Sequence, residues 1–142
     1  MSAAYYAVFH FLIDQSCRAM IGTQLAQAPY RQLLARAFAH GTMKTASRQF
    51  ATGALKPGVL HRLPSTFLLP AALQQIAATF VDLQAKRHAA DYDLTEKFNR
   101  SDVLVAIFDA ELAIQQFSAL PTSDEKKFYL LCLWAWNSLP ND

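Results

Sequence analysis

The sequence predicts an all-α protein, an up-and-down bundle of about five to six helices in a single domain covering residues 1–142. Several segments repeat apolar residues at the i, i+3, i+4, i+7 spacing of an amphipathic helix. No run alternates apolar and polar residues for long enough to indicate a sheet. The chain also has only 4 Gly and 6 Pro, which leaves little room for a turn-rich β architecture.

The first helix is expected to span residues 2–21 and to stop at Gly22. It does not have the pattern of a signal peptide, because no basic residue precedes the apolar run and His10 and Asp14 interrupt it. No segment supplies the roughly 20 nearly uncharged residues of a membrane span, so we expect no membrane association.

The middle of the chain predicts two shorter helices and a connector. Pro29 suits the first turn of a helix that continues through "YRQLLARAFAH", with His40 as its last residue. Another short helix is expected in "TMKTASRQFA". Four prolines and glycines at 57, 58, 64 and 70 then mark residues 53–70 as a connector.

The C-terminal half predicts three further helices. The segment 71–88 keeps a strong helical spacing of apolar residues. The next helix is expected to be capped by Ser101, and the last by Thr122 in a capping box with Glu125. The last helix is apolar nearly all round, so we expect it to lie in the core or to be shared with another subunit.

Composition indicates a buried surface beyond that of an ordinary monomer. Apolar residues make up 53 % of the chain and charged residues 17 %, which hints at a homo-oligomer interface. Cys17 and Cys132 are isolated and show no metal-ligand spacing, so no zinc site and no disulfide framework is predicted. Two free thiols suit a reducing cytosol, and we expect a cytoplasmic protein without a cofactor.

The net charge is only +2, but the charges are unevenly distributed. No acidic residue occurs between Asp14 and Asp82, whereas acids dominate from residue 101 onward. The acid-free stretch carries seven basic residues: Arg18, Arg31, Arg36, Lys44, Arg48, Lys56 and Arg62. This asymmetry can mark a surface for an anionic ligand, but the plainer and favoured interpretation is solvated helix faces that pair with the acidic C-terminal third.

Two pairs of polar residues interrupt these helices at a spacing of four. His10 and Asp14 can pair, with Tyr6 one turn before the histidine. The plainer interpretation is a hydrogen-bonded histidine of the core. Arg36 and His40 are expected on one face of the second helix, where a guanidinium and an imidazole suit a phosphate. The alternative for that pair is an exposed basic helix face.

A third group lies in "KRHAADYD", where Arg87 and Asp91 are one turn apart, as are His88 and Tyr92. The plainer interpretation is an Arg–Asp pair within the helix, worth a few tenths of a kcal/mol. No P-loop, nucleophile elbow or Gly-x-Gly-x-x-Gly motif occurs. Phosphate contacts would therefore come from side chains and helix ends.

Two of these segments together carry a family resemblance. "SAAYYAVFH" resembles the Ala-Tyr-Tyr-Ala-x-Phe-His signature of the HEPN (higher eukaryotes and prokaryotes nucleotide-binding) superfamily, and "RHAADYD" resembles the motif that closes a later family helix. "HGTMKTASRQF" and "SDVLVAIFDAELAIQQF" resemble further family segments in the right order. The resemblance covers roughly residues 2–120 and leaves 121–142 as an extra C-terminal helix.

The resemblance implies an HEPN-like bundle that forms a homodimer around a polar cleft and binds RNA or a nucleotide. Some family members are ribonuclease toxins paired with a nucleotidyltransferase-like antitoxin. The ribonucleases have four to six residues between an Arg and a His, a spacing that is absent here, since Arg36 and His40 leave only three. A family helix that precedes the Tyr-Tyr helix is also missing, unless another segment such as the last helix covers that face.

The leading hypothesis is an HEPN-like domain that binds RNA or a nucleotide through this cleft. The candidate catalytic residues are His10, Arg36, His40 and Arg87. The candidate ligand-binding residues are Tyr6, Asp91, Tyr92, Lys44 and Arg48. Cleavage would use metal-free attack by the ribose 2′-hydroxyl, assisted by His and Arg. The rival hypothesis is a non-enzymatic interaction or dimerisation module that uses the apolar C-terminal helix.

Overall fold

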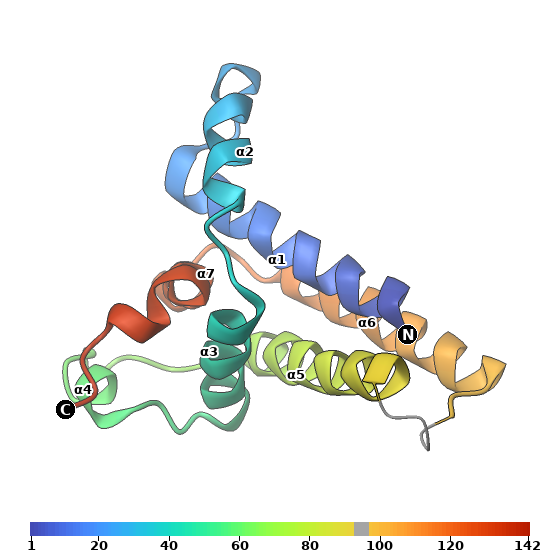
Figure 1. Ribbon diagram of the computed structural model, residues 1–142. Helices are drawn as coiled ribbons and strands as arrows, with labels where there is room; N and C mark the ends of the chain where they lie inside the picture. Colours follow the sequence, from blue (N-terminus) through green and yellow to red (C-terminus); the bar gives the residue numbers. More distant parts are fainter. Residues whose placement is uncertain (93–96) are drawn as a thin grey trace.

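The computed structural model describes residues 1–92 and 97–142, and its regular structure there is entirely helical (Figure 1). Asp93, the last residue of the "RHAADYD" motif, lies outside the described residues. The elements in chain order are α1 (Ser2–Ile21), the 3-10 turn η1 (Leu25–Gln27), α2 (Ala28–Ala35), α3 (His40–Thr52), α4 (Pro57–Leu60), α5 (Ala71–Tyr92), α6 (Arg100–Ala119), α7 (Asp124–Ala135) and the 3-10 turn η2 (Trp136–Ser138).

The three longest helices, α1, α5 and α6, form one side of the molecule (Figure 1). Helix α5 runs antiparallel to both of the others, and each of the three contacts the other two. Helix α3 packs on α5, and α7 packs on α1 and α3. This arrangement confirms the predicted all-α bundle.

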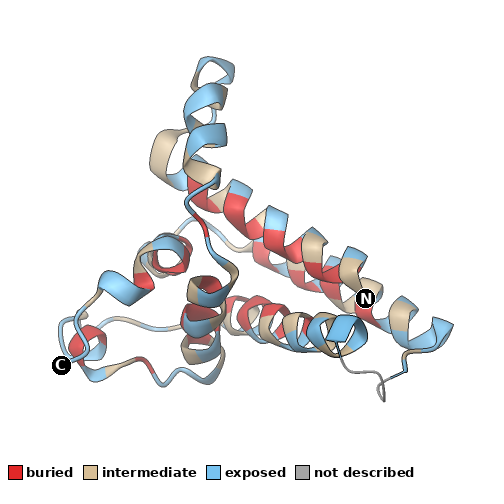
Figure 2. Ribbon diagram, in the orientation of Figure 1, coloured by how far each residue is buried: buried red, intermediate tan, exposed pale blue. Residues whose placement is uncertain are grey.

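The core lies where these helices face one another (Figure 2). Its largest fully buried side chains are aromatic: Trp136, Tyr5, Tyr129, Phe50, Phe80 and Phe117. The last helix is part of this core, because Tyr129 and Leu133 are wholly buried. On its outer side Leu131 and Trp134 remain exposed. Within the described residues, none of the helices is apolar over enough of its length to cross a membrane.

The second helix ends earlier than the sequence indicates. Helix α2 stops at Ala35, and His40 begins α3 instead of closing α2. The backbone is extended at Ala39, and the break allows Phe38 to be buried, with only 9 % of its surface exposed. The prediction that Arg36 and His40 share one helix face is therefore wrong.

The starts of two other helices also differ from the prediction. Asn99, not Ser101, caps α6, and its side chain forms a capping box with Asp102. Ser123, not Thr122, caps α7, where its hydroxyl accepts a hydrogen bond from the Lys126 amide at 3.2 Å. The connector 53–70 contains one helical turn, α4. The predicted end of α1 at Gly22 is confirmed.

Candidate functional site

Five side chains from three helices meet where α1, α3 and α5 come together. Helix α1 supplies Tyr5, Tyr6 and His10, the first residue of α3 supplies His40, and the last turns of α5 supply Arg87. We call these five residues the aromatic–basic cluster. Four of them are sequence-predicted site residues, and Tyr5 is the fifth.

Tyr5 and His40 are joined by a hydrogen bond between the phenol oxygen and Nδ1 of the imidazole. Burial raises the pKa of Tyr5 to about 12, although the charge of Arg87 acts in the opposite direction. The phenol therefore keeps its proton at neutral pH and can donate it to Nδ1. Such a bond selects the imidazole tautomer that carries its proton on Nε2.

The surroundings of His40 favour the neutral imidazole. Its ring stacks on Phe9, with centroids 4.1 Å apart and an angle of 2° between the planes. Burial lowers the pKa of His40, and the nearby charges of Arg87 and His10 lower it further. Among the described residues, Nε2 has no hydrogen-bond partner. His40 can thus offer an uncharged N–H to a ligand.

Arg87 supplies the permanent positive charge of the cluster. Its guanidinium carbon lies 5.2 Å from the ring centroid of Tyr5 and 5.3 Å from that of Tyr6. Its Nε donates to Asp91 Oδ2 at 3.4 Å, which confirms the Arg–Asp pair expected within this helix. That bond uses only one of the N–H donors of the guanidinium, so the terminal amino groups can serve other partners.

His10 is exposed and stacks on Tyr6, with centroids 5.6 Å apart. The expected pair between His10 and Asp14 is not formed, because Asp14 accepts a hydrogen bond from Arg18 at 2.9 Å. A guanidinium, which is always charged, is the stronger partner for a carboxylate. The imidazole of His10 is therefore left facing solvent.

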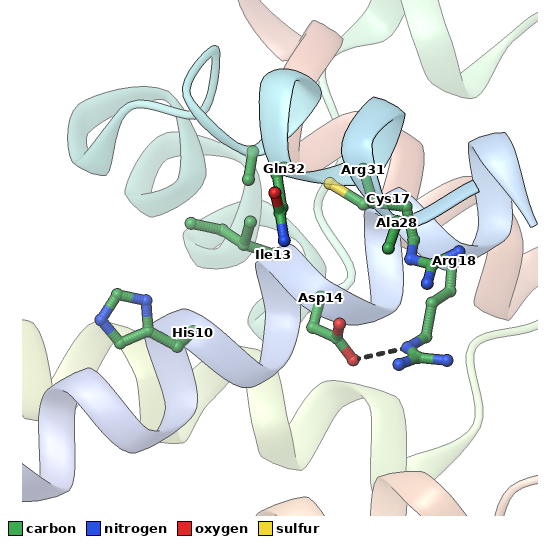
Figure 3. Close-up of a pocket in the computed structure, with 9 residues that line it drawn as sticks. His10, Ile13, Asp14, Cys17, Arg18, Ala28, Arg31 and Gln32 are labelled. Atoms are coloured by element: carbon green, nitrogen blue, oxygen red, sulfur yellow. Dashed lines mark hydrogen bonds and ion pairs between the residues drawn. The ribbon is translucent and has the colours of Figure 1, made fainter. Parts of the chain in front are cut away.

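His10 also lines a cleft of about 350 Å³ between α1 and α2 (Figure 3). We call it the α1–α2 cleft. Its polar lining is His10, Asp14, Arg18, Arg31 and Gln32, with the buried Cys17 beneath them. Burial raises the pKa of Cys17, and the carboxylate of Asp14 adds to the effect, so the thiol stays protonated at neutral pH.

The α1–α2 cleft exists because the chain folds back sharply after α1. Gly22 has φ = 115°, and a Cβ there would lie 2.3 Å from Oε1 of Gln27. Arg31 then fastens the turn, since its Nη1 donates to the carbonyls of Gly22 at 2.7 Å and Gln24 at 3.0 Å. Only glycine fits this backbone without strain.

The structure separates the other predicted residues. Arg36 joins His10 in a small hollow beside Phe9 and Phe38, so it reaches the site without facing His40. Lys44 and Arg48 lie one and two turns further along α3, and no hydrogen bond or ion pair links them to the cluster within the described part of the chain. The ring of Tyr92 lies tilted against that of His88, with centroids 4.8 Å apart, and Tyr92 is 67 % exposed.

Tyr5 and Gln32 were not predicted as site residues, and Arg31 was predicted only as one basic residue of the acid-free stretch. The ring of Tyr5 is buried in the core while its hydroxyl bonds to His40, so apolar periodicity accounts for the ring and does not reveal the partner of the hydroxyl. Arg31 and Gln32 share a helix face with Ala28 and Ala35, a spacing that could have indicated one wall of a cleft.

Comparison with models of known protein families, with curated proteins and with solved structures finds no match to this chain. Across residues 1–92 and 97–142, no three His, Cys, Asp or Glu side chains gather as they would around a metal ion. The arrangement offers N–H donors, one guanidinium and flat aromatic surfaces.

Proposed function

We propose that the chain is an HEPN-like domain that binds RNA or a nucleotide, with a phosphate group held at the aromatic–basic cluster. The observation that carries the proposal is the position of Arg87, which lies over Tyr5 and Tyr6 and pairs with the carboxylate of Asp91. The two tyrosine rings, which meet edge to face, favour this position of the guanidinium before a ligand arrives. A fixed guanidinium matches the geometry of phosphate oxygens.

The start of α3 adds partial positive charge at the same place. Its N-cap, Ala39, makes no side-chain cap, and the first turn contains no acidic residue. A Cβ at Gly41 would meet no atom within 4 Å, so the backbone there is open to an incoming group. Free amides at a helix N-terminus favour anions, and His40 is the first residue of this helix.

Aromatic surfaces supply the second element of the proposal. Tyr6 is partly exposed; its ring lies under the guanidinium of Arg87 and stacks with that of His10. The outer face of His10 is then available to a nucleobase. Proteins that bind single-stranded RNA stack bases on tyrosine, histidine and arginine in this way.

The geometry favours binding over cleavage. His40 is held neutral and donates through Nε2, so it is poorly suited to remove a proton from a ribose hydroxyl. That step would be left to His10, with Arg87 stabilising charge on the phosphorane. A gel assay for RNA fragments without added metal tests this possibility.

The decisive test is a fluorescence-anisotropy titration with single-stranded RNA at two salt concentrations. We expect the affinity of the native chain to fall with salt, because phosphate contacts release counterions. Arg87→Ala should weaken binding by about tenfold or more. Arg100→Ala is the matched control, since Arg100 is exposed at the start of α6 and lies outside the cluster. Equal losses in both variants would contradict the proposal.

The rival interaction-module hypothesis depends on the C-terminal helix. Most of the apolar residues of α7 face its own core, and Leu131 and Trp134 remain at 37 % and 47 % exposure. Homodimerisation and pairing with a nucleotidyltransferase-like antitoxin stay predictions. Light scattering of the purified chain, with Trp134→Ala as the variant, tests the role of α7 in self-association.

A further inference from the structure

His10 is part of the aromatic–basic cluster and also lines the α1–α2 cleft. Its ring stacks on Tyr6 of the aromatic–basic cluster, and its edge lines the α1–α2 cleft. The same ring borders the hollow that contains Arg36. The aromatic–basic cluster, the α1–α2 cleft and the hollow with Arg36 therefore all adjoin the exposed imidazole of His10.

The α1–α2 cleft is lined by polar groups that can still form hydrogen bonds with a ligand. Arg31 uses Nη1 for two carbonyls, and no ion pair neutralises it among the residues described. Arg18 is paired with Asp14 through Nε, which leaves its terminal amino groups unengaged by that bond. In Figure 3 the side-chain amide of Gln32 points into the space between α1 and α2.

The rest of the lining matches a nucleobase in character. Ile13, Ala28 and Ala35 provide small apolar surfaces, and the amide of Gln32 can both donate and accept hydrogen bonds. The volume of about 350 Å³ lies at the lower end of the range for small-molecule sites. A protonated Cys17 thiol does not compete as a nucleophile or metal ligand.

We propose that the ligand is a single RNA strand of several nucleotides, and that the α1–α2 cleft is a second subsite for it. This inference rests on the proposed function. One phosphate lies at Arg87 and His40, a base stacks on His10, and the next nucleotide enters the cleft. There Gln32 contacts the edge of the base while Arg31 faces its phosphate.

The dimensions of α1 support a strand over a mononucleotide. From Tyr6 to Arg18 the helix advances 12 residues, which is about 18 Å along its axis. Basic groups accompany α1 over this length, beginning with Arg87 beside Tyr6 and ending with Arg31 and Arg18. A mononucleotide would engage only one end of this series. A strand places phosphates along all of it.

The test compares uridine monophosphate with oligouridylates and oligoadenylates of increasing length, up to an octanucleotide. The variants are Gln32→Ala, Arg31→Ala and Arg87→Ala, and Gln116→Ala on the exposed side of α6 is the control for Gln32. Gln32 is the main variant, because it is exposed and holds no hydrogen bond in the described structure. Circular dichroism and thermal melting confirm that each variant is folded.

We expect affinity to rise by about tenfold or more from the mononucleotide to the octanucleotide. Gln32→Ala should lower octanucleotide affinity about fivefold and leave mononucleotide affinity unchanged, whereas Arg87→Ala should weaken both. Affinity that is independent of length, or equal losses for both ligands in Gln32→Ala, would overturn the second subsite while leaving the cluster intact. Absence of salt-dependent binding to any probe would overturn the proposed function itself.

Discussion

Tyr5 and Tyr129 are both fully buried, and each makes one hydrogen bond, yet they serve different purposes. Tyr129 bonds to Ser47 at 3.0 Å and packs on Phe50 and Phe117, and burial raises its pKa far above the ordinary value. Tyr5 bonds to His40, and a guanidinium lies over its ring. Burial alone therefore does not separate a core tyrosine from a site tyrosine; the partner of the hydroxyl does.

The same contrast separates two basic residues. The ammonium group of Lys56 donates to the carbonyls of Trp136 at 2.8 Å and Leu139 at 2.9 Å and to Asn141 Oδ1 at 3.3 Å, which uses all of its hydrogens. Within the described part of the chain, Arg87 makes one side-chain hydrogen bond, to Asp91, and keeps its other donors for a ligand. Although both cations lie over aromatic rings, Lys56 fastens the segment after α7 to the connector. The acid-free stretch is therefore not one binding surface.

The largest expected effect concerns the core side of this comparison. Phe50→Ala should lower the free energy of unfolding by about 3–5 kcal/mol, because it leaves a cavity against Tyr129 and Trp136. Urea unfolding followed by circular dichroism measures the loss. A loss below about 1 kcal/mol would show that this aromatic group does not organise the fold.

A matched pair of substitutions tests the two cations. Lys56→Met should lower the free energy of unfolding by about 1–3 kcal/mol, because three acceptors lose their donor, and should leave RNA affinity unchanged. Arg87→Met should change stability by less than about 1 kcal/mol, because its ion pair lies near the surface, and should weaken RNA binding. Weaker RNA binding in Lys56→Met together with a large loss of stability in Arg87→Met would contradict the structural role of Lys56 and the ligand-binding role of Arg87.

The two tyrosines allow a finer comparison through removal of one oxygen. Tyr129→Phe leaves the buried Ser47 hydroxyl without this partner and should cost about 1–2 kcal/mol of stability. Tyr5→Phe should instead release the tautomer of His40 and weaken RNA binding. Chemical denaturation and anisotropy titration on the same two variants separate these effects. Equal changes in stability and in RNA affinity for the two variants would show that the two hydroxyl groups do not differ in role.

The smallest expected effect is the pH dependence contributed by His40. Burial, Arg87 and His10 lower its pKa below the ordinary value of 6.5, so the folded state binds fewer protons than the unfolded state just below that pH. Above about pH 6.5 the imidazole is neutral in both states and His40 does not reduce stability. As the pH falls below that value, the unfolded state takes up the proton more readily, and the free energy of unfolding decreases. We expect the free energy of unfolding to decrease on acidification, and His40→Gln to reduce that decrease. An unchanged decrease in the variant would assign it to other groups.

The fold was predictable because helical spacing is a local property. The span of α1, its end at Gly22, the long α5 helix and the buried α7 helix all follow from apolar periodicity and from punctuating residues. The end of α2 was not predictable in this way. Burial of Phe38 depends on contacts between distant segments, and it outweighs the local helix propensity of residues 36–39.

Part of the site was also predictable, because it depends on sequence motifs and on spacing within single helices. The motif positions Tyr6, His10, His40 and Arg87 come together, and the Arg87–Asp91 pair follows from spacing within one helix. The choice of Arg18 over His10 as partner of Asp14 is a competition between two neighbours at equal spacing, which spacing alone cannot decide. The cleft between α1 and α2 requires the reversal at Gly22, whose direction is a tertiary property.

The central claim is that the aromatic–basic cluster faces a ligand while the region around Tyr129 and Lys56 is structural. Amide chemical-shift mapping of the isotope-labelled chain during titration with single-stranded RNA tests it most directly. We predict shifts concentrated at Tyr6, His10, the first turn of α3 and Arg87, with none around Tyr129. Shifts concentrated on α6 and α7, or shifts that persist unchanged in Arg87→Ala, would contradict the claim.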